Sequence, residues 1–238
     1  MNRVPAILRL LFSRRISSVW LPVILSLGVV AVMLIVVIAL RLAGVDMTAA
    51  ESIQGMRYNW GIVYTLAGFF IALGVQAATT CFSFAIALGT TRRDYVLGTA
   101  AFFVVEAVYV TALLTVLLLV EKTTGHWFIG AYVFDVAVLG DGQVLRFVPV
   151  VLLGCLAMQT VGAMFGASWL RFGMRGPLII GGGLVVLVVA GILIVVPRLA
   201  EWAQYFTGTL ALVALGVLTL TCLTSATAFL RSASPRAA

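Results

Sequence analysis

The sequence predicts an all-α membrane protein with six transmembrane helices, an amphipathic helix before the first of them, and both termini in the cytoplasm. Its composition, the spacing of its apolar runs and the charges of its loops predict this fold. The 238 residues are 63% hydrophobic and 10% charged, whereas soluble domains are roughly 45–50% apolar and about 25% charged. A large soluble domain beside the membrane helices is therefore excluded.

Six apolar runs have the length of a membrane span. A hydrocarbon core about 30 Å thick is crossed by roughly 20 helical residues. Runs of about this length cover residues 19–40, 60–88, 96–120, 147–170, 178–196 and 206–230. The stretch 126–139 is too short to span, so we expect it to lie at the interface or to re-enter partway. We therefore expect one transmembrane domain, 1–238, with an N-terminal segment 1–18, a six-span bundle 19–230 and a tail 231–238.

The loop charges predict the orientation, because Lys and Arg are retained preferentially on the cytoplasmic side of a membrane. One set of loops, together with both chain ends, carries one acid and ten basic residues: Arg3, Arg9, Arg14, Arg15, Arg92, Arg93, Arg171, Arg175, Arg231 and Arg236. The opposite set carries five basic residues against six acids. Both termini are therefore expected in the cytoplasm. The net charge of +7 follows topology and does not indicate a nucleic-acid partner, because such proteins gather basic residues on one solvated face.

The sequence predicts no catalytic centre. The only lysine, Lys122, lacks the preceding glycines of a phosphate-binding loop, so we expect no ATP site in this chain. The only histidine, His126, belongs to no cluster with the spacing of metal ligands, so we expect no metal site. The chain is accordingly expected not to be an enzyme and to hold no cofactor.

One acid, Glu106, lies deep within a predicted span. Ionisable groups at this depth are costly, which indicates a function such as proton coupling or contact with a cationic substrate. The alternative is a protonated glutamic acid that faces the interior and is hydrogen-bonded to a neighbouring polar group. The candidate partners are Gln76, Gln159, Tyr109 and Thr111. Gln76 and Gln159 are themselves interpreted either as polar packing groups or as ligand contacts.

Small residues in the fourth span predict a close helix contact. Gly162 and Gly166 form a Gly-x-x-x-Gly pattern, which permits two helix backbones to approach each other. The contact is expected either within this chain or at a seam between subunits.

Two segments on the predicted cytoplasmic side carry the most information. Residues 3–20 form a basic amphipathic stretch that would lie on the inner leaflet. Between the second and third spans, Gly89 is placed to end one helix, and Thr91 or Asp94 to cap the next. Arg92 and Arg93 would then project from a tight turn, where a soluble partner could apply force.

This turn resembles the first cytosolic loop of bacterial ABC-2 type permeases, the membrane subunits of ABC exporters. The resemblance rests on a helix end rich in small residues, then Gly-x-x-Arg-Arg, an acid, an aromatic residue and a nearby glycine, within residues 88–98. In that family an N-terminal elbow helix precedes six spans, and the loop docks on a separate ATPase. The resemblance implies coupling roles for Gly89, Arg92, Arg93, Asp94 and Tyr95, and places Arg9, Arg14 and Arg15 in the elbow.

The resemblance implies a transport subunit of the bacterial cytoplasmic membrane. It would export a lipophilic, peptide or drug-like substrate, with ATP and Mg²⁺ bound by a cytosolic P-loop ATPase partner. A second permease subunit, identical or similar, would complete the path through the lipid bilayer. The short connection between the fifth and sixth spans departs from many members of the family. Two alternatives are a proton-coupled secondary transporter that uses Glu106, and a membrane sensor or immunity protein without transport activity.

Overall fold

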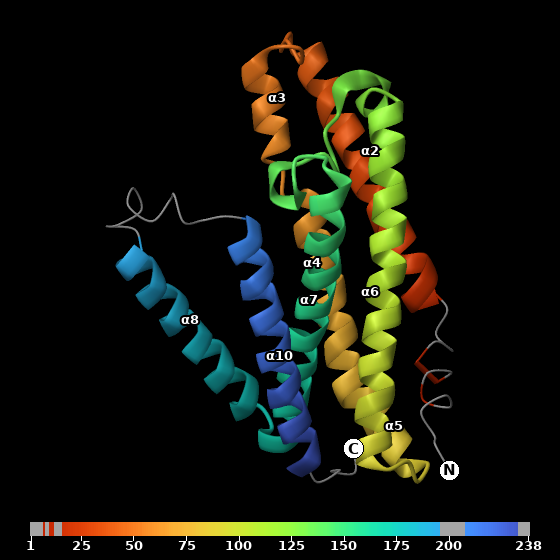
Figure 1. The fold of residues 1–238 in the computed structure, drawn as a ribbon, viewed down its shortest axis with the longest axis vertical. Helices are drawn as coiled ribbons and strands as arrows, with labels where there is room; N and C mark the ends of the chain where they lie inside the picture. Colours follow the sequence, from red (N-terminus) through yellow and green to blue (C-terminus); the bar gives the residue numbers. More distant parts are fainter. Residues whose placement is uncertain (1–6, 8–9, 12–15, 196–207, 233–238) are drawn as a thin grey trace. The chain divides into compact units, whose positions relative to one another are not determined.

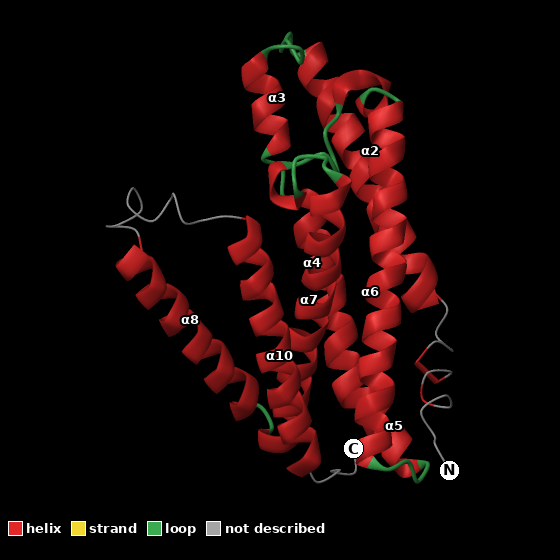
Figure 2. Ribbon diagram, viewed as in Figure 1, coloured by secondary structure: helices red, strands yellow, loops and turns green. Residues whose placement is uncertain are grey.

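The computed structural model describes residues 7, 10, 11, 16–195 and 208–232. Figure 2 shows that the described part of the chain consists of helices joined by loops. Its main helices are α2 (Leu21–Leu42), α3 (Ala50–Arg57), α4 (Gly61–Gln76), α5 (Phe82–Ala87), α6 (Arg92–Thr123), α7 (Val144–Phe172), α8 (Arg175–Val195) and α10 (Gly208–Ser232). Short π-helical segments lie before α2 (Ile16–Trp20), between α4 and α5 (Ala77–Cys81, η2) and after α6 (His126–Gly130). A 3₁₀ turn, Ala137–Leu139, precedes α7. The prediction of an all-helical chain is confirmed for these residues.

Five helical segments of the described chain are long and apolar enough to cross a membrane. They are Ser18–Leu42, Ala50–Ala87, Arg92–Thr123, Val144–Phe172 and Thr209–Arg231. Each contains most or all of one predicted span. Helices of this kind are typical of a multi-pass membrane protein.

The remaining predicted span, 178–196, falls mostly on α8. This helix is continuous from Arg175 to Val195, and its described apolar stretch, Arg175–Val186, is shorter than a full crossing. Six spans therefore stay a prediction. The elbow arginines Arg9, Arg14 and Arg15 lie outside the described residues.

The chain divides into two compact units. Unit 1 comprises Met1–Leu11, Ile71–Ala100 and Ala157–Ala238. Unit 2 comprises Phe12–Phe70 and Ala101–Leu156. Helices α4, α6 and α7, which are labelled in Figure 1, each contribute residues to both units.

Unit 1 contains a tight contact between α4 and α7. A Cβ added to Gly162 would lie 2.1 Å from the carbonyl oxygen of Ile71, and one added to Gly74 would lie 2.1 Å from that of Gln159. Both distances are far below any real Cβ contact, so only glycine permits the two backbones to approach this closely. Gly166 lies further along the same face, where its added Cβ would be 2.9 Å from the carbonyl oxygen of Val75. The Gly-x-x-x-Gly pattern thus packs within the chain.

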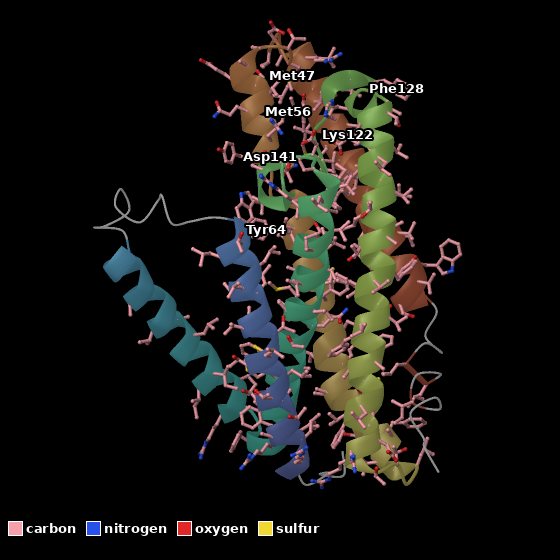
Figure 3. The ribbon with its side chains drawn as sticks, viewed as in Figure 1. Met47, Met56, Tyr64, Lys122, Phe128 and Asp141 are labelled. Atoms are coloured by element: carbon pink, nitrogen blue, oxygen red, sulfur yellow. The ribbon has the colours of Figure 1, made fainter. Side chains whose placement is uncertain are left out.

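Unit 2 contains an apolar cluster at the ends of its helices. Val37, Met47, Met56 and Ala131 are buried together, and Trp127 packs against them with other partly buried side chains. Met47 comes from the α2–α3 connection and Met56 from α3, as Figure 3 shows. Helix α3 was not among the elements expected from the sequence, because it has only eight residues and its composition is too polar for a membrane span.

The turn before α3 is organised by Asp46. Its Oδ1 accepts hydrogen bonds from the backbone N–H of Thr48 at 2.8 Å and from the Thr48 hydroxyl at 2.6 Å. These bonds hold the pKa of Asp46 below its ordinary value, because they stabilise the charged form. Ser52 donates a further bond to the Asp46 carbonyl oxygen at 2.8 Å. The local bonds fix where α3 begins.

Candidate functional site

The candidate site in unit 1 is the turn between α5 and α6, which we call the α5–α6 turn (residues 88–95). Gly89 adopts φ +75° and ends α5 as predicted. Its N–H donates to the carbonyl oxygen of Ile86 at 2.9 Å, and the N–H of Thr90 donates to that of Ala85 at 3.1 Å. This pair of bonds is the Schellman arrangement, in which a left-handed residue satisfies the last carbonyls of a helix. A residue with a side chain would be strained at position 89.

The first turn of α6 is capped by Thr91. The Oγ1 of Thr91 accepts a hydrogen bond from the backbone N–H of Asp94 at 3.1 Å, which satisfies one of the free donors at a helix start. Asp94 also places a negative charge in the first turn, where it complements the positive end of the helix dipole. The turn is therefore closed by hydrogen bonds on both sides, and its shape is set locally.

The two arginines of the turn have different environments. Arg92 is half-buried, and its guanidinium donates hydrogen bonds to the carbonyl oxygens of Leu230 and Arg231, near the end of α10. Those carbonyls lack partners within their own helix, and a cation suits the negative end of the dipole. Arg93 is exposed. Arg92 thus ties the turn to α10, and Arg93 is left to face outward.

Tyr95 joins the turn to a second element. Its side chain is fully buried, and its hydroxyl donates a hydrogen bond to the carbonyl oxygen of Ala77 in η2. The ring also packs edge-on against Phe82, with centroids 5.3 Å apart. Segments of π-helix within longer helices often occur at functional sites. Tyr95 is therefore an internal anchor of the α5–α6 turn, and its side chain is not exposed to a partner.

Replacing Tyr95 with phenylalanine should lower the stability of unit 1 by about 1–2 kcal/mol, because the Ala77 carbonyl loses a buried donor while the packing is kept. Thermal unfolding of the variant and the unchanged protein in detergent measures this change in stability. The matched control is Tyr109→Phe, because the Tyr109 hydroxyl also donates to a backbone carbonyl, that of Val19, at 3.0 Å, but at an exposed position. We expect the control to change stability by less than about 0.5 kcal/mol. Equal effects would contradict the anchoring role.

The described part of the N-terminal segment reaches the same region of unit 1. Residues Ile7, Leu10 and Leu11 have helical backbone, and Ile7 and Leu11 are buried. A Cβ added to Gly98, in the second turn of α6, would lie 2.7 Å from Cγ2 of Ile7. Because Gly98 has no side chain, Ile7 of the N-terminal segment can pack against α6 at this position.

The intramembrane polar residues are placed differently from one another. Gln76 is exposed at the end of α4. Gln159 is fully buried in α7, and neither its side-chain oxygen nor its nitrogen has a hydrogen-bond partner among the described residues. Glu106 is also fully buried, and both of its carboxyl oxygens lack a partner in the described chain. Tyr109 and Thr111, two predicted partners of Glu106, donate instead to the carbonyl oxygens of Val19 and Ala107.

Unit 2 contains a network of charged residues, which we call the loop network (Glu121, Lys122, Arg57, His126, Asp135 and Asp141). The buried carboxylate of Glu121, near the end of α6, accepts three backbone N–H bonds. The donors are Val133 at 3.1 Å, Phe134 at 2.7 Å and Asp135 at 3.3 Å. One side chain thus holds a loop segment whose own amides have no helix or sheet to pair with.

Ion pairs extend the loop network to α3. The Arg57 guanidinium lies 3.3 Å from Oδ1 of Asp135 and 3.4 Å from Oδ1 of Asp141. His126 Nε2 lies 3.3 Å from the other carboxylate oxygen of Asp135. Lys122 donates a bond of 2.9 Å to the carbonyl oxygen of Gly142, and Lys122 and Asp141 are both labelled in Figure 3. The loop network therefore joins α3, the end of α6 and the loop before α7.

His126 of the loop network and the two residues that follow it have strained backbone. His126, Trp127 and Phe128 adopt φ values of +60°, +58° and +62°, which cost about 1–2 kcal/mol each for residues with a Cβ. The His126 ring stacks on Tyr132, with centroids 3.9 Å apart. The backbone N–H of Trp127 donates to Thr124 Oγ1 at 3.1 Å. Phe128 is 84% exposed. Its side chain is labelled in Figure 3.

Sequence reasoning used these loop charges only to assign orientation, and it missed the network. A possible signal was the concentration of acids and bases within residues 121–146, together with the Gly140, Asp141, Gly142 run. All three of those residues have positive φ, and an added Cβ at Gly142 would lie 2.7 Å from the Asp135 carboxylate. The network has no metal-binding geometry: within the described residues no group of three His, Cys, Asp or Glu side chains could hold an ion.

Comparison of the chain with protein-family models, with curated proteins and with solved structures finds no match.

Proposed function

We propose that the chain is the transmembrane subunit of an ABC-2 type exporter in a bacterial cytoplasmic membrane. The observation that carries the proposal is the α5–α6 turn. Its exposed Arg93 stands between Arg92, which is bound to the end of α10, and Tyr95, which is bound to η2. The turn therefore combines an outward cation with two rigid attachments to membrane-length segments.

This arrangement suits the transfer of force. A turn that is closed by the Gly89 and Thr91 bonds resists bending, so a push on Arg93 moves the ends of α5 and α6 together. Arg92 and Tyr95 pass the movement to α10 and to the π-helical segment between α4 and α5. A soluble ATPase that presents acidic residues to Arg93 would supply the push when ATP and Mg²⁺ bind to it.

The same proposal accounts for the partners. ATP hydrolysis takes place on the separate P-loop ATPase, and this chain transmits the movement. A second permease subunit, identical or similar, completes the substrate path, because one chain offers few helices to enclose it. The cargo we propose is lipophilic, a peptide or drug-like, in keeping with the apolar composition of the bundle.

The test is a charge reversal at Arg93. The membrane subunit is affinity-purified from membranes of the bacterium that produces it, and the ATPase activity recovered with it is measured. Arg93→Glu should reduce this activity at least about tenfold, the equivalent of roughly 1.4 kcal/mol of binding free energy. Arg93→Lys should retain most of it, because the positive charge is kept.

The matched control is Arg175→Glu. Arg175 is also exposed and also predicted to be cytoplasmic, but it lies at the start of α8, outside the turn. We expect this variant to recover the ATPase as the unchanged protein does. Equal recovery with Arg93→Glu and the unchanged protein would contradict the proposal, as would labelling of an Arg93→Cys variant from the outer face of intact cells.

A further inference from the structure

Helix α6 carries two fully buried carboxyl groups in opposite environments. Glu121 accepts three backbone N–H bonds. Glu106 accepts none from any described residue, and neither of its oxygens is reached by solvent. The two side chains lie fifteen positions apart on one helix, and Glu106 is roughly 20 Å along the helix from Arg92 at a rise of about 1.5 Å per residue.

The groups around Glu106 supply no compensating positive charge. The titratable side chains of the described residues that interact electrostatically with it are Tyr109, one turn further along α6, and Cys155 on α7. Both are uncharged at neutral pH in their ordinary state. The Tyr109 hydroxyl donates to the Val19 carbonyl oxygen, and Cys155 is a buried free thiol. A negative charge on Glu106 would therefore stand without a partner.

An uncompensated carboxylate is far more costly to bury than a neutral carboxylic acid, because only the charged form loses a large hydration energy. The carboxylate of Glu121 recovers part of that loss through its three N–H donors. No described residue donates a hydrogen bond to Glu106, so its carboxylate would recover none of that hydration energy in this way. The neutral, protonated form is therefore the one that fits the structure at position 106.

We propose that Glu106 is a proton-binding site within the bundle. In the described conformation a proton taken from water is bonded to one carboxyl oxygen and the side chain is neutral. Release leaves the carboxylate and returns the proton to water, which requires α6 and α7 to admit water around Glu106. The site therefore links protonation to helix packing. This inference does not depend on whether an ATPase drives the protein.

The test uses the unchanged protein in native-like bilayer discs and a hydrophobic carbodiimide, which adds to a protonated buried carboxyl group and leaves a stable N-acylurea. Peptide mass spectrometry assigns the modified residue. We expect modification at Glu106 and not at Glu121, which serves as the internal control on the same helix. Above the pH at which half of the Glu106 carboxyl groups are protonated, the extent of modification should fall by about tenfold for each pH unit.

Infrared spectroscopy supplies a second readout that does not require the reagent to enter the bundle. The spectrum should contain a carboxylic-acid C=O band that Glu106→Gln removes and that fades as the pH rises, while Glu121→Gln leaves it in place. Protection of the Cys155 thiol from labelling shows that each variant is folded. If the spectrum of Glu106→Gln keeps every carboxylic-acid band of the unchanged protein, the proposal is overturned. A band that persists unchanged to strongly alkaline pH would overturn it equally, because the proton would not be exchangeable.

Discussion

Replacing Glu121 with alanine is expected to lower the free energy of unfolding by about 3–5 kcal/mol. The change leaves the N–H groups of Val133, Phe134 and Asp135 without their acceptor, and an unpaired buried donor costs about 1–3 kcal/mol. Two of these residues are fully buried and Asp135 is 8% exposed, so water replaces little of the loss. Glu121→Gln keeps one acceptor oxygen and should fall between alanine and the unchanged protein.

The measurement uses a native thiol of unit 2. Cys155 is 5% exposed, so a maleimide that fluoresces on reaction reports the temperature at which unit 2 opens. Cys81 and Cys222 are changed to alanine in every sample, including the reference. The control is Glu51→Ala, at an exposed position in the first turn of α3, where we expect a change below about 0.5 kcal/mol. An opening temperature for Glu121→Ala equal to that of the control would show that the carboxylate does not hold the loop.

Gly162→Ala should lower stability by about 2–3 kcal/mol, the second-largest effect we expect. The new methyl group would meet the Ile71 carbonyl oxygen at 2.1 Å, and a backbone atom cannot rotate aside as the end of a side chain can. Helices α4 and α7 would have to separate, which loses packing along their whole contact. Cys222 in α10, 3% exposed, is the thiol that reports opening of unit 1, in a background without Cys81 and Cys155.

The matched control lies in unit 1 as well. An added Cβ at Gly216 in α10 meets no atom within 4 Å, so Gly216→Ala makes the identical chemical change inside a helix of unit 1 without a clash. We expect it to leave stability unchanged or to raise it, because alanine is the better helix former. If both variants open at the same temperature, the close approach at Gly162 does not limit stability.

The positions of the long helices could be predicted from the sequence because they follow from local composition. A run of about 20 apolar residues is sufficient to predict a span, whatever it packs against. Predicted residues 96–120 and 147–170 accordingly lie within Arg92–Thr123 and Val144–Phe172. The same local rules placed the end of α5 at Gly89 and offered Thr91 or Asp94 as the cap of α6, and the structure shows that Thr91 is the cap.

The roles of individual residues at the α5–α6 turn could not be predicted in the same way. Arg92 and Arg93 are adjacent and chemically identical, yet Arg92 contacts carbonyls about 140 positions away and Arg93 is exposed. Tyr95 was grouped with the coupling residues, and its side chain is buried against η2. The sequence also did not show that Tyr109 and Thr111 bond elsewhere and that Glu106 has no hydrogen-bond partner among the residues described.

What the sequence alone determined, then, is a chain of apolar helices with charged turns, because the free energy of placing a residue in hydrocarbon depends mainly on that residue and its neighbours along the chain. The tertiary structure decided which polar groups have partners: Glu121 bonds three amides, Glu106 bonds no residue of the described chain, and Arg92 bonds the end of another helix. Hydrogen bonds and ion pairs act over a few ångströms, and the residues they join are distant in sequence. Folding alone brings them together.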